Sequence, residues 1–293
     1  MAETTFYDMD DLGCKINYRF IQPPQIAYLI TTVDGRGNAN TTPATLGTCV
    51  GASLPRNGRP SEYFYTFSLG AVDIPDPGNK LNSRHGYQNL KQVPECVISY
   101  FGYDLMHESW LTALPVPYGI SEIEVAGLTF LKSRKVSPPG IAECPVNMEA
   151  RVIQTVKLGH YYEHFICRIV GVSVNSRLVK MDADRGDGLG IFHTDPLFEV
   201  RIIRGETGTL RLYYGRMDPD KICRTSDEVG CITDWIGDFE KWIDDERKRG
   251  KITSEQRDEI IELNKRWQQD RDPNRNRSVK EQLTRRLRTL VLA

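Results

Sequence analysis

The chain has 293 residues, of which 40% are hydrophobic and 26% are charged, and its formal net charge is −1. This length is enough to bury a sizeable core in one domain or two. The near-zero net charge argues against a whole-protein binder of nucleic acid or of a membrane surface. No apolar run approaches the roughly 18 residues that a membrane-spanning helix needs, and the N-terminal segment lacks the basic-then-apolar order of a signal peptide. We therefore expect a cytoplasmic protein with no nucleic-acid and no membrane partner.

The seven cysteines are scattered along the chain and form no CxxC pair. No Cys/His cluster has the spacing of a zinc site. Cys96 and Cys167 lie inside apolar strand patterns, where a free thiol behaves as a small hydrophobe. The sequence therefore predicts structural thiols in a reducing compartment and no metal site.

Up to about residue 216 the hydrophobic pattern has mostly period two, in short runs rich in Val, Ile, Thr, Tyr and Phe. Asp34-Gly35 is a strong signal for a hairpin turn. One helix is expected at Ser83–Val93, before Pro94. About eight strands with few helices between them indicate an antiparallel barrel, which removes exposed sheet edges by closing. The expected strands are Ile26–Val33, Ala39–Val50, Tyr63–Leu69, Cys96–Phe101, Val125–Leu131, Val146–Val156, Phe165–Val174 and Phe198–Ile203.

After Arg216 the pattern becomes helical, with three amphipathic segments. Each has a Ser/Thr-x-x-Glu/Gln sequence that is typical of a capping box, at Thr225, Thr253 and Ser278. Pro273 and the following polar residues are expected to separate the last two helices. The apolar faces are Ile232, Ile236, Phe239 and Trp242, then Ile260, Leu263 and Trp267, then Val279, Leu283, Leu287 and Leu290.

The last 20 residues carry six Lys or Arg and one Glu. A basic amphipathic helix of this kind is able to contact nucleic acid, acidic lipid or a protein partner. The alternative, which we favour, is a solvated polar face whose leucines, Leu283, Leu287 and Leu290, dock on the barrel or on a second subunit.

Two blocks of the sequence resemble a known family. The segment AGLTFLKSRKVSPPGIAECPVNMEA at 126–150 is similar to AGLTxxxSxKVxPPxIAESPVxLEC, and PQIAYLITTVDGRGNANTTPATLGT at 24–48 is similar to PVxLVTTxDxxGxxNxAPxS. These are blocks of the flavin reductase-like family of FMN-binding split barrels, which includes flavoredoxin. The resemblance covers about residues 20–216. It implies a mainly β, antiparallel split-barrel domain at 1–218 and a homodimer with FMN between the barrels. The helical pattern after this domain predicts a C-terminal α-helical extension at 219–293.

In that family the NxAPxS segment lines the flavin ring and the ribityl chain. The resemblance carries this role onto Asn40, Thr42, Pro43, Ala44 and Thr45, and Thr48 continues the same wall. A segment rich in Thr is also an ordinary strand, because Thr favours sheets. We favour flavin contact.

The family's phosphate site is an RKDT-like run at the start of a helix, where free N–H groups and the helix dipole attract an anion. Here the run is Ser83-Arg84-His85-Gly86, so the Asp and Thr of the family pattern are replaced by His85 and Gly86. Ser83 still supplies a hydroxyl and Arg84 a cation. Lys135, in the second basic loop, is a further candidate near the flavin or the nicotinamide, although a basic loop of this kind is often only solvated.

Many NAD(P)H-dependent members carry Gly-Asp-His where this chain has Gly-His-Tyr-Tyr-Glu-His at 159–164. Either His160 or His164 is a candidate to take over the catalytic role beside the nicotinamide. A single His at the entrance of a strand is more often structural. No GxGxxG motif opens a βαβ unit, so any NADH or NADPH has to bind transiently over the flavin.

The resemblance therefore implies an FMN-dependent oxidoreductase that passes a hydride from NAD(P)H through flavin to a small-molecule or protein acceptor. Two alternatives remain open within the flavoproteins: an FMN electron carrier of the flavoredoxin type that does not use NAD(P)H, and an FMN-dependent enzyme with a specific organic substrate. A third is a binding module without enzymatic activity, because a fold does not fix a function.

Overall fold

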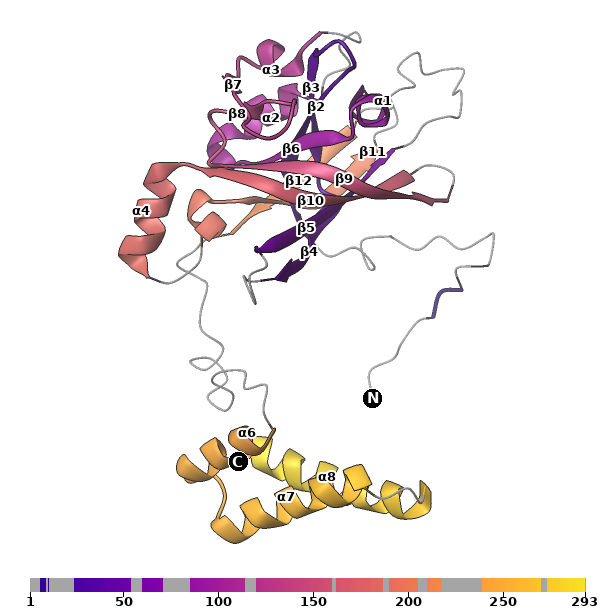
Figure 1. Cartoon of the computed structure of the whole chain (residues 1–293), viewed down its shortest axis with the longest axis vertical. Coiled ribbons are helices and arrows are strands. Elements are labelled where there is room, and N and C mark those ends of the chain that lie inside the picture. Colours follow the sequence, from indigo (N-terminus) through magenta and orange to yellow (C-terminus); the bar gives the residue numbers. More distant parts are fainter. Residues whose placement is uncertain are drawn as a thin grey trace. The chain divides into compact units, whose positions relative to one another are not determined.

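The computed structural model divides the chain into two compact units, Met1–Pro219 and Asp220–Ala293. It describes residues 6–8, 10, 24–53, 60–70, 85–113, 120–159, 162–186, 190–204, 210–217, 239–269 and 273–292. Figure 1 shows a β-rich first unit and a helical second unit. Among the described residues, no helix is both long and apolar enough to cross a membrane.

A seven-stranded sheet forms most of the first unit, in the order β3-β2-β6-β9-β10-β5-β4, and every neighbouring pair is antiparallel. A second antiparallel sheet has the order β1-β11-β12. This architecture, with the helical second unit, confirms the predicted fold class. The strands are β1 (Gln25–Ile26), β2 (Tyr28–Val33), β3 (Ala39–Ala44), β4 (Gly47–Ser53), β5 (Glu62–Gly70), β6 (Glu95–Tyr100), β7 (Phe130–Leu131), β8 (Gly140–Ile141), β9 (Val146–Leu158), β10 (Tyr162–Val174), β11 (Leu197–Arg204) and β12 (Leu210–Arg216).

The hairpin predicted from Asp34-Gly35 joins β2 to β3. The Asp34 carboxylate accepts hydrogen bonds from the backbone of Arg36 and from both the backbone and the side chain of Asn38. Gly37 has a φ of +89°, which favours glycine. These contacts fix the register Val33↔Ala39, and with it the position of every β3 side chain.

Strand β2 is buried on both faces, and its side chains pack alternately into two separate hydrophobic cores. One core fills the inside of the barrel, where Tyr28 and Ile30 pack with Phe67 and Phe165. The other core contains Leu29 and lies between the sheet and two short helices. Cys96 and Cys167 belong to the first core and Cys144 to the second, and all three are free thiols. The prediction of buried structural thiols is confirmed for these three; Cys49 is exposed, and Cys14, Cys223 and Cys231 lie outside the described residues.

The first unit also contains four α-helices among its described residues. Helix α1 packs near β2, β3 and β5 (Figure 1), and its Leu90 and Tyr87 join the inner core. The short helices α2 and α3 cover the second core. The helices are α1 (His85–Gln92), α2 (Met106–Leu111), α3 (Glu122–Val125) and α4 (Ser176–Arg185), with 3₁₀ turns at Tyr103–Leu105 and Gly190–Thr194.

Two strand predictions were wrong. The expected strand Ala39–Val50 is two strands, because the chain turns at Thr45-Leu46 between β3 and β4. The expected strand Val125–Leu131 instead follows a helical turn, α3, and only Phe130–Leu131 is extended. Gly127 has a φ of +71° and ends that turn, which is the usual role of a glycine after a helix.

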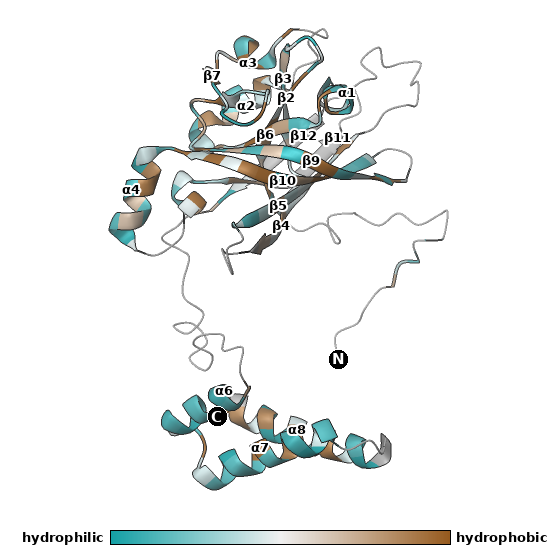
Figure 2. Ribbon diagram, in the orientation of Figure 1, coloured by the Kyte–Doolittle hydropathy of each residue, from teal (hydrophilic) through white to brown (hydrophobic). Residues whose placement is uncertain are grey.

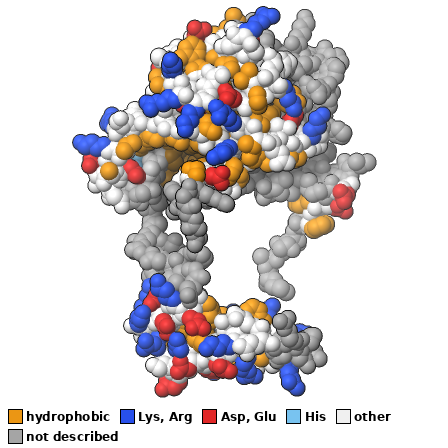
Figure 3. Space-filling model, in the orientation of Figure 1, with side chains coloured by type: hydrophobic (Ala, Val, Ile, Leu, Met, Phe, Trp, Pro, Cys, Tyr) orange, Lys and Arg blue, Asp and Glu red, His pale blue; other side chains and the backbone are white. Residues whose placement is uncertain are grey.

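The second unit consists of α6 (Phe239–Lys248), α7 (Ser254–Gln269) and α8 (Pro273–Leu292) in the part that the structure describes. Figure 2 shows hydrophobic stretches between hydrophilic ones along these helices, and Figure 3 shows both acidic and basic side chains on the visible face of the unit. The apolar side chains pack on one another. This core contains Ile243, Ile260, Ile261, Leu263, Val279, Leu283 and Leu290, with Phe239, Trp242, Ile252 and Leu287 against it.

One capping-box prediction in this unit is confirmed. The backbone of Gln256 donates to Oγ1 of Thr253 (3.2 Å), and the backbone of Thr253 donates to Oε1 of Gln256 (2.9 Å). The prediction for Ser278 was wrong, because α8 already begins at Pro273, a residue suited to the first turn of a helix. Thr225 lies outside the described residues. The leucines of α8 pack inside the helical unit itself, which corrects the expectation that they dock elsewhere.

Candidate functional site

Four of the predicted flavin contacts, Asn40, Thr42, Pro43 and Ala44, lie on β3. Among the described strands, β3 pairs only with β2, so it is an edge strand of the sheet. Proline has no N–H to donate, and an edge strand is where a sheet tolerates it. The side of β3 that faces away from β2 therefore presents backbone and side-chain groups to a ligand.

Thr45 and Thr48 lie at the turn into β4 and on β4 itself. Gly47 makes this turn tight, and its N–H donates to the carbonyl of Thr45 (3.0 Å). A Cβ at Gly47 would lie 2.1 Å from the hydroxyl of Tyr28 and 2.5 Å from the carbonyl oxygen of Thr66. The wall that the sequence predicts for the flavin therefore rests directly on the barrel core.

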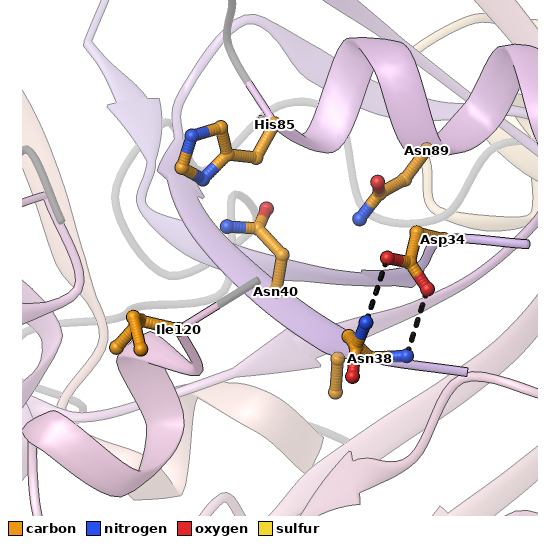
Figure 4. A pocket seen from close by; sticks show the side chains of 7 residues that line it. Asp34, Asn38, Asn40, His85, Asn89 and Ile120 are labelled. Carbon is orange, nitrogen blue, oxygen red and sulfur yellow. Dashed lines mark hydrogen bonds between the residues drawn. The ribbon is translucent and has the colours of Figure 1, made fainter. Parts of the chain in front are cut away.

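The N-terminal end of α1 lies against β3. A Cβ at Gly86 would be 3.3 Å from Oγ1 of Thr42 and 3.5 Å from Oδ1 of Asn40. Figure 4 shows His85 and Asn40 on the two sides of this contact. The structure thus brings the helix start that was predicted to bind phosphate onto the strand that was predicted to bind the flavin. Ser83 and Arg84 themselves lie outside the described residues.

A small cavity opens beside these residues, between the β2–β3 hairpin and α1 (Figure 4). Its volume is about 10 Å³, which is about the least that can hold one water molecule. A flavin ring is far larger, so it has to lie over these side chains rather than in the cavity. The lining residues are Asp34, Asn38, Ala39, Asn40, His85, Asn89 and Ile120.

Sequence analysis missed Glu122, a buried carboxylate at the centre of this site. Its side chain accepts a hydrogen bond from Nδ2 of Asn40 (2.6 Å) and from the backbone of Thr41 (3.4 Å). Nδ1 of His85 lies 3.5 Å from the same carboxylate. The available signal was the pattern SEIE, in which Ser121 precedes a helical turn. The apolar pattern of the residues that follow, Val125–Leu131, predicts a strand rather than a helix and so conceals that signal.

Lys135 is placed elsewhere by the structure. Its N–H and that of Arg134 donate to the buried carboxylate of Glu149 (2.6 and 2.9 Å), and its carbonyl accepts from Arg151 (2.6 Å). These contacts anchor the basic loop to β9, which β2 and β6 separate from β3 in the sheet order. Among the described residues, no hydrogen bond or ion pair joins the Lys135 side chain to the β3 residues.

His164 lies on β10, and its Nδ1 is 2.9 Å from the hydroxyl of Ser68 on the neighbouring strand. It shares a face of the hairpin with its cross-strand partner Val156 and with Tyr162. The structure therefore gives His164 a structural hydrogen bond within the sheet. His160, the other candidate, lies outside the described residues.

Glu163 points to the opposite face and ties β10 to α1. Its carboxylate accepts hydrogen bonds from Lys91 and from the hydroxyl of Tyr87 (2.9 Å). Burial by itself raises the pKa of Glu163, but hydrogen bonds from Lys91, Thr155 and Tyr87 and the charge of Lys91 outweigh burial and hold that pKa below its usual value. The ion pair between Glu163 and Lys91 holds α1 against β10, and so it also fixes the start of α1 at the candidate site.

Glu163→Gln is expected to lower the free energy of unfolding at pH 7 by about 2 kcal/mol, because it weakens two partly buried charge-assisted hydrogen bonds to a buried carboxylate. A depressed pKa stabilises the fold above the unfolded-state pKa of about 4.3, and this contribution is lost as the pH falls through the folded-state pKa. The difference between wild type and variant should therefore shrink as the pH falls below about 5 in urea unfolding. Glu62→Gln is the control, since Glu62 pairs with Arg168 at 3.7 Å in a half-exposed position. A difference that does not change with pH would contradict this account.

A family model for the flavin reductase like domain matches residues 23–187. This range includes both of the sequence segments, 24–48 and 126–150, that resemble the family. The chain belongs to this family. The resemblance seen in the sequence is thereby confirmed, and the protein is a flavin reductase-like split-barrel protein.

Among solved structures, the chain is similar to nitrilotriacetate monooxygenase component B from Bacillus cereus, with a TM-score of 0.56 and 19% identity over 74% of this chain and 97% of that one. It is also similar to a flavin reductase with a split barrel domain from Shewanella frigidimarina, with a TM-score of 0.52 and 18% identity over 75% and 98% of the two chains. These likenesses support the fold.

An uncharacterized protein from Halalkalibacterium halodurans is 29% identical over 154 residues, which are 51% of this chain and 66% of the relative. The chain covers between 44% and 66% of the length of four curated relatives that it matches.

Proposed function

We propose that this protein is an FMN-dependent oxidoreductase that passes electrons from NAD(P)H through flavin to an acceptor. The observation that carries the proposal is the contact between the start of α1 and the edge strand β3, within a domain of the flavin reductase family. This contact joins a helix N-terminus, which suits a phosphate, to a strand with hydroxyl and amide groups, which suit a ribityl chain.

The described residues fit the chemistry of FMN. Thr42, Thr45 and Thr48 supply hydroxyls, Asn40 supplies an amide, and the edge of β3 supplies backbone groups. Gly86 lets the start of α1 pack closely on β3, since a Cβ there would lie 3.3 Å from Oγ1 of Thr42. The bound flavin would supply the hydride and electron chemistry, while these residues would hold and orient its polar parts.

The electron donor is tested by adding NADH, and then NADPH, to the flavin-loaded protein without oxygen. We expect the flavin absorbance near 450 nm, roughly where oxidised flavin absorbs, to fall within seconds with one of the two donors. An absorbance that persists with both donors would contradict the use of NAD(P)H, but it would not contradict the proposed flavin site.

One observation favours a second candidate, an FMN electron carrier that does not use NAD(P)H. His164 is engaged with Ser68 rather than presented beside an Asp, as in the Gly-Asp-His pattern of the family's NAD(P)H-dependent members. A carrier would keep its bound FMN and accept electrons from a protein partner. Rapid bleaching by NADH or NADPH would exclude this candidate.

We further propose a homodimer that uses the outer face of the β9–β10 hairpin. Val156, Leu158 and Tyr162 are 39%, 47% and 43% exposed, which is unusual for neighbouring large apolar side chains. Leu158 lies opposite Tyr162 in the register, so the three side chains share one face. A second copy of the chain would cover this apolar face and complete the flavin site.

Val156→Asp is expected to convert the dimer into a monomer, because it places a charge within the apolar face. Light scattering after size exclusion should give twice the chain mass of 33.4 kDa for wild type and the single mass for the variant. Val179→Asp is the matched control, since Val179 is 55% exposed on α4. A wild-type protein with the single mass, or a dimeric Val156→Asp variant, would contradict this interface.

A further inference from the structure

Helix α8 is much more basic than α7, the helix that packs against it. It has six Lys or Arg and one Glu, whereas α7 has three Lys or Arg and four Asp or Glu. Most of this excess lies on one face of α8, along an open groove of about 440 Å³. We call this surface the basic face; its described residues are Arg277, Lys280, Glu281, Thr284, Arg285 and Arg288.

The cations of the basic face are mostly left without an acidic partner. Arg277 pairs with Glu281 (3.2 Å) within the helix. Among the described residues, no ion pair engages the side chain of Lys280, Arg285 or Arg288, and all three residues are exposed. They lie within roughly 12 Å of one another along the helix axis. The face therefore presents a short row of positive charge that this part of the protein does not neutralise.

The occupant of this face is not a lipid surface, because the apolar face of α8 is already buried. Val279, Leu283 and Leu290 pack in the core of the helical unit. A helix that lies on a membrane inserts its apolar face into the boundary between headgroups and acyl chains. The described residues of the basic face include no apolar side chain that would take over this role.

Two features of the helical unit favour a protein over a nucleic acid. Among its described residues, the basic face has no aromatic side chain on which a base could stack. The adjacent α7 exposes Glu255 and Glu262, which form no ion pair in the part of the chain that is described. These carboxylates would repel a long polyanion that crosses the unit. A compact acidic patch on a protein matches the short basic face without reaching α7.

We propose that the basic face of α8 is a docking surface for an acidic patch on a partner protein. Lys280, Arg285 and Arg288 would pair with carboxylates of the partner, and an Arg side chain does so through two parallel hydrogen bonds. Pairs between exposed charges are individually weak, so docking is transient and sensitive to salt. Because α8 belongs to the same chain as the flavin reductase-like domain, a docked partner stays at a raised effective concentration around that domain. Docking at this face needs no bound flavin.

The test measures binding of a fluorescent peptide of about 12 glutamates to the full-length protein by anisotropy, at about 20 mM salt, where screening is weak. The test variant combines Arg285→Glu with Arg288→Glu. The matched control combines Lys265→Glu with Arg266→Glu, which makes the same change in net charge at exposed positions of α7. We expect the α8 variant to bind the peptide at least about tenfold more weakly and the control to stay within about twofold of wild type.

Chemical cross-linking locates the contact on the protein. A carbodiimide joins a lysine amine to a carboxylate that touches it, and Lys280 is the one lysine among the described residues of the basic face. We expect mass spectrometry of the digested product to find the peptide joined to Lys280. A cross-link to the lysines of α6 or α7 in its place would overturn the proposal.

Three other results would also overturn the proposal. One is a wild-type protein that does not bind the peptide, and another is an equal loss of binding in the α8 variant and in the control. The third is tighter binding of a short DNA duplex or of phosphatidylserine vesicles than of the peptide, which would assign the face to a nucleic acid or to a lipid surface. Thermal melting shows whether each variant is folded. If the charge-reversed α8 variant is not, Arg285→Gln with Arg288→Gln removes the same positive charges without adding acids, and its peptide affinity decides.

Discussion

Gly47→Ala is expected to lower the free energy of unfolding by about 3 kcal/mol, at the upper end of the usual cost of overpacking a core. The added methyl group would lie 2.1 Å from the Tyr28 hydroxyl and 2.5 Å from a backbone oxygen, that of Thr66. The Tyr28 side chain is fully buried among other core aromatics, so it has little room to move. The backbone of β5 has even less, because it pairs with strands on both sides.

The same strand provides the control for this prediction. A Cβ at Gly51, also on β4, would lie 3.5 Å from its nearest neighbour, Phe64, which is an ordinary contact distance. Gly51→Ala should therefore change the free energy of unfolding by less than about 0.5 kcal/mol. Urea unfolding of both variants makes the comparison. Equal stabilities for the two variants would show that the turn at Gly47 is not packed on Tyr28 in this way.

Gly86→Val is expected to weaken FMN binding by at least about tenfold, or roughly 1.4 kcal/mol. Its Cβ alone would lie within 3.5 Å of polar atoms on Thr42 and Asn40. The two further methyl groups of valine would push the start of α1 away from β3, and these are the two elements proposed to hold the flavin. Calorimetric titration with FMN measures the loss, and the melting temperature without ligand verifies that the variant is folded.

A graded pair of controls separates this effect from a change in the helix. Gly86→Ala adds only the Cβ at 3.3 Å and should cause a smaller loss than valine. Gln88→Val places the same β-branched residue elsewhere in α1, away from β3, and should leave FMN affinity unchanged. If a folded Gly86→Val variant bound FMN with wild-type affinity, this result would show that the flavin does not bind at this end of α1.

Most strands were predictable because their signals are local. The alternation in β2, the Asp34-Gly35 turn and the paired apolar runs of β9 and β10 each depend on residues close in sequence. The turn between β3 and β4 was not predictable in the same way. Thr45 and Leu46 carry no turn residue between them, and the bend depends on Gly47 meeting Tyr28, which is 19 positions away in the chain.

The site shows the same division between local and distant contacts. Asn40 and the start of α1 could be predicted as candidates because motifs mark them. Their contacts with each other and with Glu122 depend on how β3, α1 and α3 pack together. Asn40 and Glu122, for example, are 82 positions apart in the chain. Likewise, the segment at 159–164 suggested a histidine at the nicotinamide. The structure gives His164 a bond to Ser68 and makes Glu163 the partner of α1, because neighbouring residues of a strand face opposite sides.

The central claim is that the barrel binds FMN beside β3 and the start of α1. The most direct measurement is a visible absorbance spectrum of the purified full-length protein, followed by titration with FMN. We predict a flavin band near 450 nm, roughly the position for oxidised flavin, that reaches one FMN per chain. The Gly86→Val variant should need at least about tenfold more free FMN to reach half of that occupancy. A folded protein that shows no band and takes up no added FMN would contradict the claim.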